Sequence, residues 1–186
     1  MIRGAAPYRG GVVDAAQRVL LKVFRLLPRR VRRWLVRAGT PKYTVGAICI
    51  VERRDGAILL VRHSYVSRWG TPGGLAKRRE PIDVAAARET MEEVNLPVEL
   101  VGEPSVVVEP IPRRVDVVFL ARPAIDAPLD DVRPSSPEIV ATGWFHPHEL
   151  PELQPETATA LVALSRDGRI DLSGSGLKPS AARRTI

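Results

Sequence analysis

The chain has 186 residues, of which 45% are hydrophobic and 26% charged, values typical of a globular protein with one domain and short extensions. Its single cysteine, Cys49, excludes an intrachain disulfide and a cysteine-based zinc site within one chain. No run of about 18 apolar residues occurs, so the sequence predicts no membrane-spanning helix, no secretion and a cytoplasmic location.

Basic residues are concentrated at the beginning of the chain. Residues 1–42 contain eleven Lys and Arg and one acid, Asp14, for a charge of +10, so the remainder carries −3 of the total of +7. An acidic region that acts on an anionic substrate needs cations to neutralise it, whereas the basic segment suits a phosphate-rich surface.

Residues 1–42 predict an arm of two helices. The apolar residues of the first helix recur with helical spacing, and its basic residues fall on the opposite side. Pro28 ends or kinks this helix, and a second, shorter one runs to Gly39. The apolar side is expected to pack on the domain or on a second copy in a homodimer, or to lie on a membrane surface through residues 12–37. Aromatic residues are sparse here, so nucleic acid is not an expected partner.

From Tyr43 the apolar pattern becomes strand-like. Two apolar runs, 43–51 and 57–62, flank a turn that contains Asp55-Gly56, which predicts a hairpin. A helix is expected from about Ile82 to Val94, with Asn95 ending it in the left-handed conformation.

After this helix, three more strands are expected at about 98–108, 114–122 and 138–145, with a polar loop at 123–137 before the last of them. A final helix is expected at about 156–164, followed by a disordered tail at 165–186.

The helix at 82–94 predicts the chemistry. Glu89, Glu92 and Glu93 stand at i, i+3 and i+4, which places three carboxylates on one side of the helix. Their repulsion raises their pKa values unless a cation lies among them, and such oxygen ligands suit Mg²⁺ or Mn²⁺. The alternative is a solvated helix face. A separate stripe of Val84, Ala87, Met91 and Val94 is expected to pack on a sheet while the glutamates face outward.

The segment from Gly74 resembles the Nudix box, in which a glycine, a glutamate and an Arg-Glu-x-x-Glu-Glu run recur at fixed spacing. Thr90 stands at an apolar position of that pattern, and Asn95 replaces its final glycine. The resemblance covers about residues 43–164 and implies an α/β fold, an α/β/α sandwich around a mixed β-sheet, with residues 1–42 as a basic helical extension. The matching residues are Gly74, Glu80, Arg88, Glu89, Glu92, Glu93 and Leu96.

The resemblance also implies a metal-dependent pyrophosphohydrolase, a hydrolase that acts on acid anhydrides. It makes Glu89, Glu92 and Glu93 ligands of Mg²⁺ (Mn²⁺ as the alternative). In addition, Glu80 is expected as an outer ligand or brace, and Arg88 as the residue that orients a carboxylate.

Two further roles are less constrained by the resemblance. The general base varies among relatives; Glu93 and Glu138 are the candidates here, although Glu138 equally suits an exposed strand start. Basic residues around the box are candidate phosphate contacts, with a solvated surface as the alternative: Arg62, Lys77, Arg78 and Arg79.

The expected substrate is a nucleoside diphosphate linked to another group, such as ADP-ribose or a nucleotide sugar. Pro112 supports this expectation, because it lies sixteen residues beyond the box, a spacing that resembles ADP-ribose-cleaving members. A nucleoside triphosphate, including an oxidised nucleotide, is the alternative within the class. A non-catalytic nucleotide-sensing module is the alternative outside it.

Overall fold

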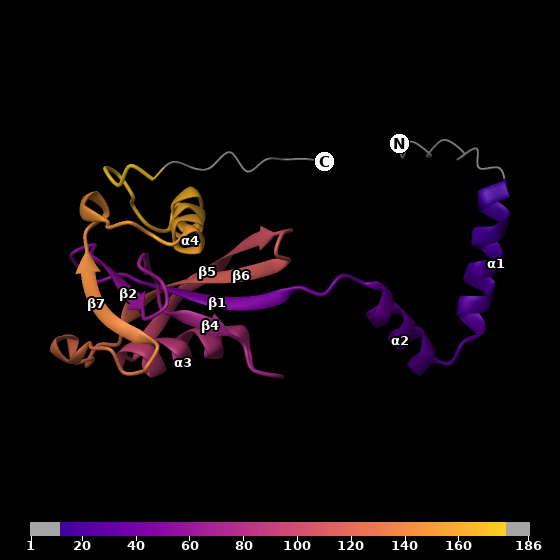
Figure 1. Cartoon of the computed structure of the whole chain (residues 1–186), viewed down its shortest axis with the longest axis horizontal. Helices are drawn as coiled ribbons and strands as arrows, with labels where there is room; N and C mark the ends of the chain where they lie inside the picture. Colours follow the sequence, from indigo (N-terminus) through magenta and orange to yellow (C-terminus); the bar gives the residue numbers. More distant parts are fainter. Residues whose placement is uncertain (1–11, 178–186) are drawn as a thin grey trace. The chain divides into compact units, whose positions relative to one another are not determined.

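Two compact units divide the chain, Met1–Lys42 and Tyr43–Ile186. The structure, a computed structural model, describes residues 12–177. The first unit contains α1 (Val12–Leu26) and α2 (Arg29–Gly39), so the predicted pair of helices separated by Pro28 is present (Figure 1). Proline is tolerated immediately before a helix because the first turn needs no partner for its N–H. Among residues 12–177, no helix has the length and apolar character needed to cross a membrane.

Two sheets form the centre of the second unit. The first is mixed, because β1 runs parallel to β6 while the other pairings are antiparallel. Its strand order is β4 (Gly73–Leu75), β1 (Thr44–Val51), β6 (Arg114–Pro123), β5 (Val98–Glu109). The second is antiparallel, in the order β3 (Trp69–Gly70), β2 (Ile58–His63), β7 (Ile139–Phe145).

Helices α3 (Ile82–Val94) and α4 (Pro155–Arg166) cover opposite faces of these sheets (Figure 1). Strand β1 serves both sides, since Cys49 packs in the core beneath α3 and Ile50 in the core beneath α4. This arrangement confirms the expected α/β/α sandwich. Two short 3₁₀ helices, Leu129–Asp131 and Pro147–Glu149, flank β7.

The predicted hairpin at 43–62 has the right strands but the wrong pairing. Apart from one bridge between Glu52 and Ile58, β1 and β2 separate after the turn and enter different sheets. The reason is that both edges of β1 are occupied by β4 and β6, while β2, whose first four residues are buried, finds its partners in β3 and β7.

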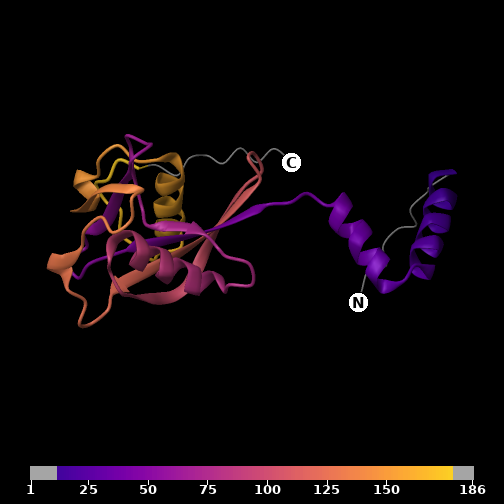
Figure 2. The same cartoon turned by 60° about the horizontal axis from the view of Figure 1, so that its bottom comes forward.

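Strands β5 and β6 pair along most of their length and end in a turn that projects from the sheet (Figure 2). Pro112 lies in this turn, after Ile111, which is 90% exposed. The proline that supports the ADP-ribose expectation therefore stands at the end of a ribbon and does not line the cavity described below.

Helix α3 buries a face that shares Val94 with the predicted stripe but otherwise differs from it. Ala85, Ala86 and Thr90 are completely buried, whereas Val84 and Met91 are exposed. The prediction was wrong because it assumed that all the glutamates face outward, while Glu93 is buried and turns that side of the helix inward. Thr90 suits the buried position because its hydroxyl donates to the carbonyl oxygen of Ala86 at 2.9 Å.

Residues after 164 differ from the expected disordered tail in their described part. Helix α4 continues to Arg166, and Ile170 and Leu172 are buried in the core beneath it. Arg169 donates hydrogen bonds to the carbonyl oxygens of Val101 and Glu103, which closes this segment onto β5. The ordered domain thus reaches beyond 164; residues 178–186 of the expected tail lie outside the described residues.

Candidate active site

A cavity of about 830 Å³ opens between the two sheets, beside α3 and the first turn of α4. Its acidic side chains come from three separate segments: Glu89 and Glu93 from α3, Glu138 from the residue before β7, and Glu156 from α4. The remaining lining residues are Ile48, His63, Tyr65, Val66, Arg68, Thr71, Gly73, Gly74, Leu75, Arg114, Gln154, Pro155 and Thr157.

Glu93 is the buried carboxylate of this cavity. It is 7% exposed, and its Oε2 accepts a hydrogen bond from the backbone N–H of Gly73 at 3.3 Å. Burial raises the pKa of Glu93 to about 8, and the negative charges of Glu89 and Glu138 add to the rise. At neutral pH the site therefore holds either a proton or a cation.

Arg88 connects the carboxylates along one side of α3. Its Nε and second terminal nitrogen donate to the two oxygens of Glu80 at 2.7 and 3.0 Å. Its other terminal nitrogen donates to Glu89 at 2.8 Å and to Glu92 at 2.9 Å. These bonds hold the pKa of Arg88 well above its usual value, and Arg88 together with the N–H of Lys77 lowers the pKa of Glu80 to about 2.

Glu80 consequently acts as a brace. Both of its oxygens are used by Arg88 and by the Lys77 backbone, and it does not line the cavity. Glu92 also points elsewhere: it is half exposed and pairs with Arg88 and, at 3.5 Å, with Lys77. Of the three glutamates predicted to act together, the structure brings Glu89 and Glu93 into the cavity and leaves Glu92 at its outer side.

Gly74 allows the approach of Glu89. A Cβ atom at residue 74 would lie 2.5 Å from the Glu89 carboxyl carbon, so a larger residue there would displace this carboxylate. The glycine that begins the box motif thus lets the Glu89 carboxylate keep its position against β4.

The predicted phosphate contacts are not brought into the cavity. Arg62 lies over the ring of Trp69 at 5.8 Å, and Lys77, Arg78 and Arg79 belong to the exposed loop before α3. None of the four is among the described residues that line the cavity. Sequence spacing placed them near the box, but the loop directs them to solvent.

Arg114 is a cavity residue that sequence reasoning missed. Its Nε donates to both oxygens of the buried Asp116, at 2.7 and 2.8 Å, which leaves its two terminal nitrogens for other partners. Gly46, opposite Asp116 on β1, makes room for this pair, because a Cβ there would lie 2.2 Å from the Asp116 oxygen. The alternation of Arg114 and Asp116 along a strand was the available signal.

His63 and Gln154 also line the cavity without having been predicted. Gln154 Nε2 lies 3.3 Å from His63 Nδ1 and donates to the carbonyl oxygen of Arg68. Burial lowers the pKa of His63, although the charge of Glu138 opposes this effect. No sequence motif joins these residues, because they come from β2 and the start of α4.

The oxygen donors of the cavity suit a divalent cation. Within residues 12–177, no three His, Cys, Asp or Glu side chains are already gathered closely enough to enclose a metal ion. Mg²⁺ nevertheless keeps several waters and is typically held by one or two carboxylates together with substrate phosphates. Glu89 and Glu93 meet that requirement, and a cation would offset the burial and the neighbouring negative charges that raise the pKa of Glu93.

A carboxylate-lined cavity of this kind, set in an α/β/α sandwich, suits a hydrolase that works with a divalent cation. The NUDIX domain family model matches residues 42–164. The chain therefore belongs to the Nudix family and is a pyrophosphohydrolase.

Individual relatives agree with this assignment. A MutT-like protein of Streptomyces ambofaciens is 28% identical over 128 residues, which cover 69% of this chain and 80% of the relative. The MutT Nudix hydrolase of Burkholderia pseudomallei is similar in structure, with a TM-score of 0.55, 28% identity and coverage of 67% of this chain and 99% of that one. The ADP-ribose pyrophosphatase of Streptococcus suis 89-1591 is also similar in structure, with a TM-score of 0.56 and 26% identity. The match covers 70% of this chain and 95% of that one.

Proposed function

We propose that this enzyme hydrolyses the diphosphate linkage of a nucleoside diphosphate joined to a second group, of the ADP-ribose or nucleotide-sugar type, with Mg²⁺ or Mn²⁺. The observation that carries the proposal is the placement of Glu89, Glu93 and Glu138 around one cavity. The similarity to a structure named as an ADP-ribose pyrophosphatase supports the substrate class.

Glu89 and Glu93 are the residues that would hold the cation. When bound, it neutralises the diphosphate and makes a water molecule more acidic. Arg88 fixes Glu89 from outside, so that the carboxylate keeps one orientation while the substrate binds. Glu80 in turn fixes Arg88 through two bonds.

Glu138 is the base that we propose for deprotonating the attacking water. It is exposed at the cavity rim, on a separate segment from α3, and its charge reaches Glu93. Its backbone is held in place, since its carbonyl oxygen accepts from the N–H of Ser64 at 2.8 Å. Glu93 is less suited to this task, because a carboxylate that ligates a cation has fewer lone pairs for a proton.

Arg114 supplies the positive charge for the substrate. Asp116 holds its Nε, so the two terminal nitrogens present a fixed fork, the geometry that recognises phosphate oxygens. A cavity of about 830 Å³ is large enough for a ligand with groups on both sides of the diphosphate.

The test is product release from ADP-ribose, a UDP-sugar and nucleoside triphosphates, each with Mg²⁺ and with Mn²⁺. The proposal expects AMP from ADP-ribose, or UMP from the UDP-sugar, at rates well above release of pyrophosphate from any triphosphate. Preferential release of pyrophosphate from triphosphates would instead assign the alternative substrate class. Arg114→Ala should raise KM more than it lowers kcat, whereas Arg54→Ala, an exposed arginine outside the cavity, should change neither.

A further inference from the structure

The arm helices have an apolar side that the described residues of their own unit leave uncovered. Leu20 is 67% exposed, Leu26 86% and Trp34 66%. On α2, Val31, Trp34 and Leu35 recur at i, i+3 and i+4, which places them on one side of the helix. An apolar side of this extent on two consecutive helices is normally covered by a partner.

The opposite side of the arm is strongly basic. Residues 17–39 contain eight Lys and Arg and no acid. Five of these are the arginines of α2, and none of the five forms an ion pair with a described residue of the first unit. With no acidic side chain beside them, these guanidinium groups remain available for anionic groups of a partner.

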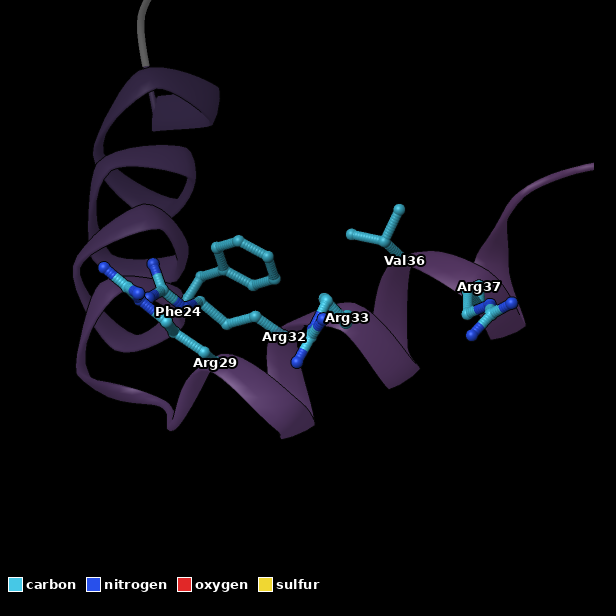
Figure 3. Close-up of a pocket in the computed structure, with 6 residues that line it drawn as sticks. All are labelled: Phe24, Arg29, Arg32, Arg33, Val36 and Arg37. Atoms are coloured by element: carbon cyan, nitrogen blue, oxygen red, sulfur yellow. The ribbon is translucent and has the colours of Figure 1, made fainter.

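The arginines gather where the two helices meet. A hollow of about 690 Å³ lies between α1 and α2, and Figure 3 shows Phe24 of α1 beside Arg29 and Arg32 of α2. Arg33 and Arg37 continue this positive row along α2. Several guanidinium groups around one hollow provide paired donors for phosphate oxygens.

We propose that residues 17–39 bind the surface of a bilayer that contains anionic lipid. The apolar side, with Leu20 and Trp34, would enter the boundary between headgroups and acyl chains, while the arginines contact the lipid phosphates. The exposed apolar residues favour this occupant over nucleic acid, because the aliphatic side chains of Leu20, Leu26 and Leu35 have no ring on which a base can stack and would stay in contact with water. A membrane is also favoured over a second copy, because apolar packing of two arms would leave their basic sides without anionic partners, whereas lipid phosphates neutralise them.

The experiment uses the full chain and vesicles of phosphatidylcholine with or without phosphatidylglycerol, measured by co-sedimentation. We expect binding to the vesicles with phosphatidylglycerol, weak binding to phosphatidylcholine alone, and release by about 1 M salt, which shortens electrostatic range to about 3 Å. Arg32→Glu with Arg33→Glu should weaken binding on the order of 30-fold, from about fivefold per lost cation. Arg32→Lys with Arg33→Lys should retain it.

Two more variants separate the sources of binding. Trp34→Asp should also weaken vesicle binding, because it places a charge on the apolar side. Arg54→Glu with Arg122→Glu changes the net charge equally on the second unit and should leave binding unchanged. Circular dichroism and retained hydrolysis show that each variant is folded.

Three results would overturn the proposal. The first is equal vesicle binding by wild type and by Arg32→Glu with Arg33→Glu. The second is binding to RNA or inorganic phosphate without binding to vesicles. The third is a dimer, seen by sedimentation velocity, that dissociates in the Trp34→Asp variant while this variant still binds vesicles as wild type does.

Discussion

Glu93 shows how one residue joins stability to chemistry. Its carboxylate is buried, has a single backbone donor at Gly73, and faces the charges of Glu89 and Glu138. Without a cation, the ionised form is unfavourable there, and its pKa rises to about 8. A cation in the cavity removes this penalty and displaces the proton, so metal binding near neutral pH should release protons.

The first prediction concerns the pH dependence of stability of the metal-free protein. The pKa of Glu93 in the folded protein lies above its ordinary value of 4.5. The stability that the protonated Glu93 contributes to the folded state is therefore fully present below about pH 4.5 and is lost as the pH rises towards about 8. The free energy of unfolding should therefore fall over this window, by on the order of 5 kcal/mol from Glu93 alone. Urea unfolding of wild type and Glu93→Gln in a chelator checks this, and equal slopes against pH in both proteins would refute it.

The second prediction concerns Arg88. Lysine keeps the charge but cannot donate to Glu80 with two parallel bonds and to Glu89 with a third. Arg88→Lys should reduce metal affinity or kcat by about 10- to 100-fold, as expected for the loss of an outer partner of a metal ligand. Metal titration followed by steady-state kinetics measures both effects. Arg54→Lys is the matched control, and an unchanged Arg88→Lys enzyme would show that Glu89 needs no brace.

At the scale of elements, the end of α3 depends on Asn95. This residue has φ 55° and ψ 38°, the left-handed conformation that was predicted for it, and its side chain donates to Asp131 at 3.0 Å. Asparagine replaces the family's glycine here because its short polar side chain tolerates positive φ and gains this bond.

The third prediction separates these two contributions of Asn95. Asn95→Ala should lower the free energy of unfolding by roughly 1–2 kcal/mol, because alanine strains the left-handed backbone. Asn95→Gly should lower it by less, since only the bond to Asp131 is lost. Thermal or urea unfolding gives the values. If glycine is as damaging as alanine, the side-chain bond and not the backbone conformation determines the effect.

Elements with strong local signals could be predicted from the sequence, whereas their partners could not. The helix at 82–94 and the strands near 98–109 and 114–123 follow from periodicity and turns. The separation of β1 from β2 depends on which distant strands compete for their edges, which local patterns do not contain. The buried face of α3 was misassigned because a buried Glu93 contradicts the general rule that glutamates are exposed.

The same limit applies to the site. Glu80, Glu89, Glu93 and Glu138 could be proposed as candidate site residues from spacing and resemblance. Arg114 and His63 were not, because they reach the cavity from β6 and β2, strands of two different sheets. Conversely, Arg62, Lys77, Arg78 and Arg79 looked suitable only because they are near in sequence; their side chains do not line the cavity.

At the scale of the whole molecule, the domain extends beyond the segment that resembles the Nudix family. Ile170 and Leu172 pack beneath α4, and Ser105 Oγ lies 2.5 Å from Asp167 Oδ2, which ties the segment after α4 to β5. This segment therefore completes the core beneath α4, the helix whose first turn brings Gln154 and Glu156 to the cavity.

The fourth prediction follows from this packing. Ile170→Ala should lower the free energy of unfolding by about 2–4 kcal/mol, because it leaves a cavity in the core. Ile125→Ala, at a side chain that is 82% exposed, should change it by less than about 0.5 kcal/mol. Denaturant unfolding of both variants makes the comparison. Equal stabilities would mean that residues after 166 do not belong to the folded core.

The most direct test of the account is hydrolysis of ADP-ribose as a function of Mg²⁺ concentration by wild type, Glu93→Gln, Glu138→Gln and the exposed control Glu103→Gln. We predict that Glu93→Gln loses both activity and metal affinity, the activity by more than the ~100-fold expected for an outer partner. Glu138→Gln should lose activity but keep metal affinity, and Glu103→Gln should match wild type. Metal-dependent hydrolysis that survives Glu93→Gln undiminished would contradict the assignment of this cavity as the active site.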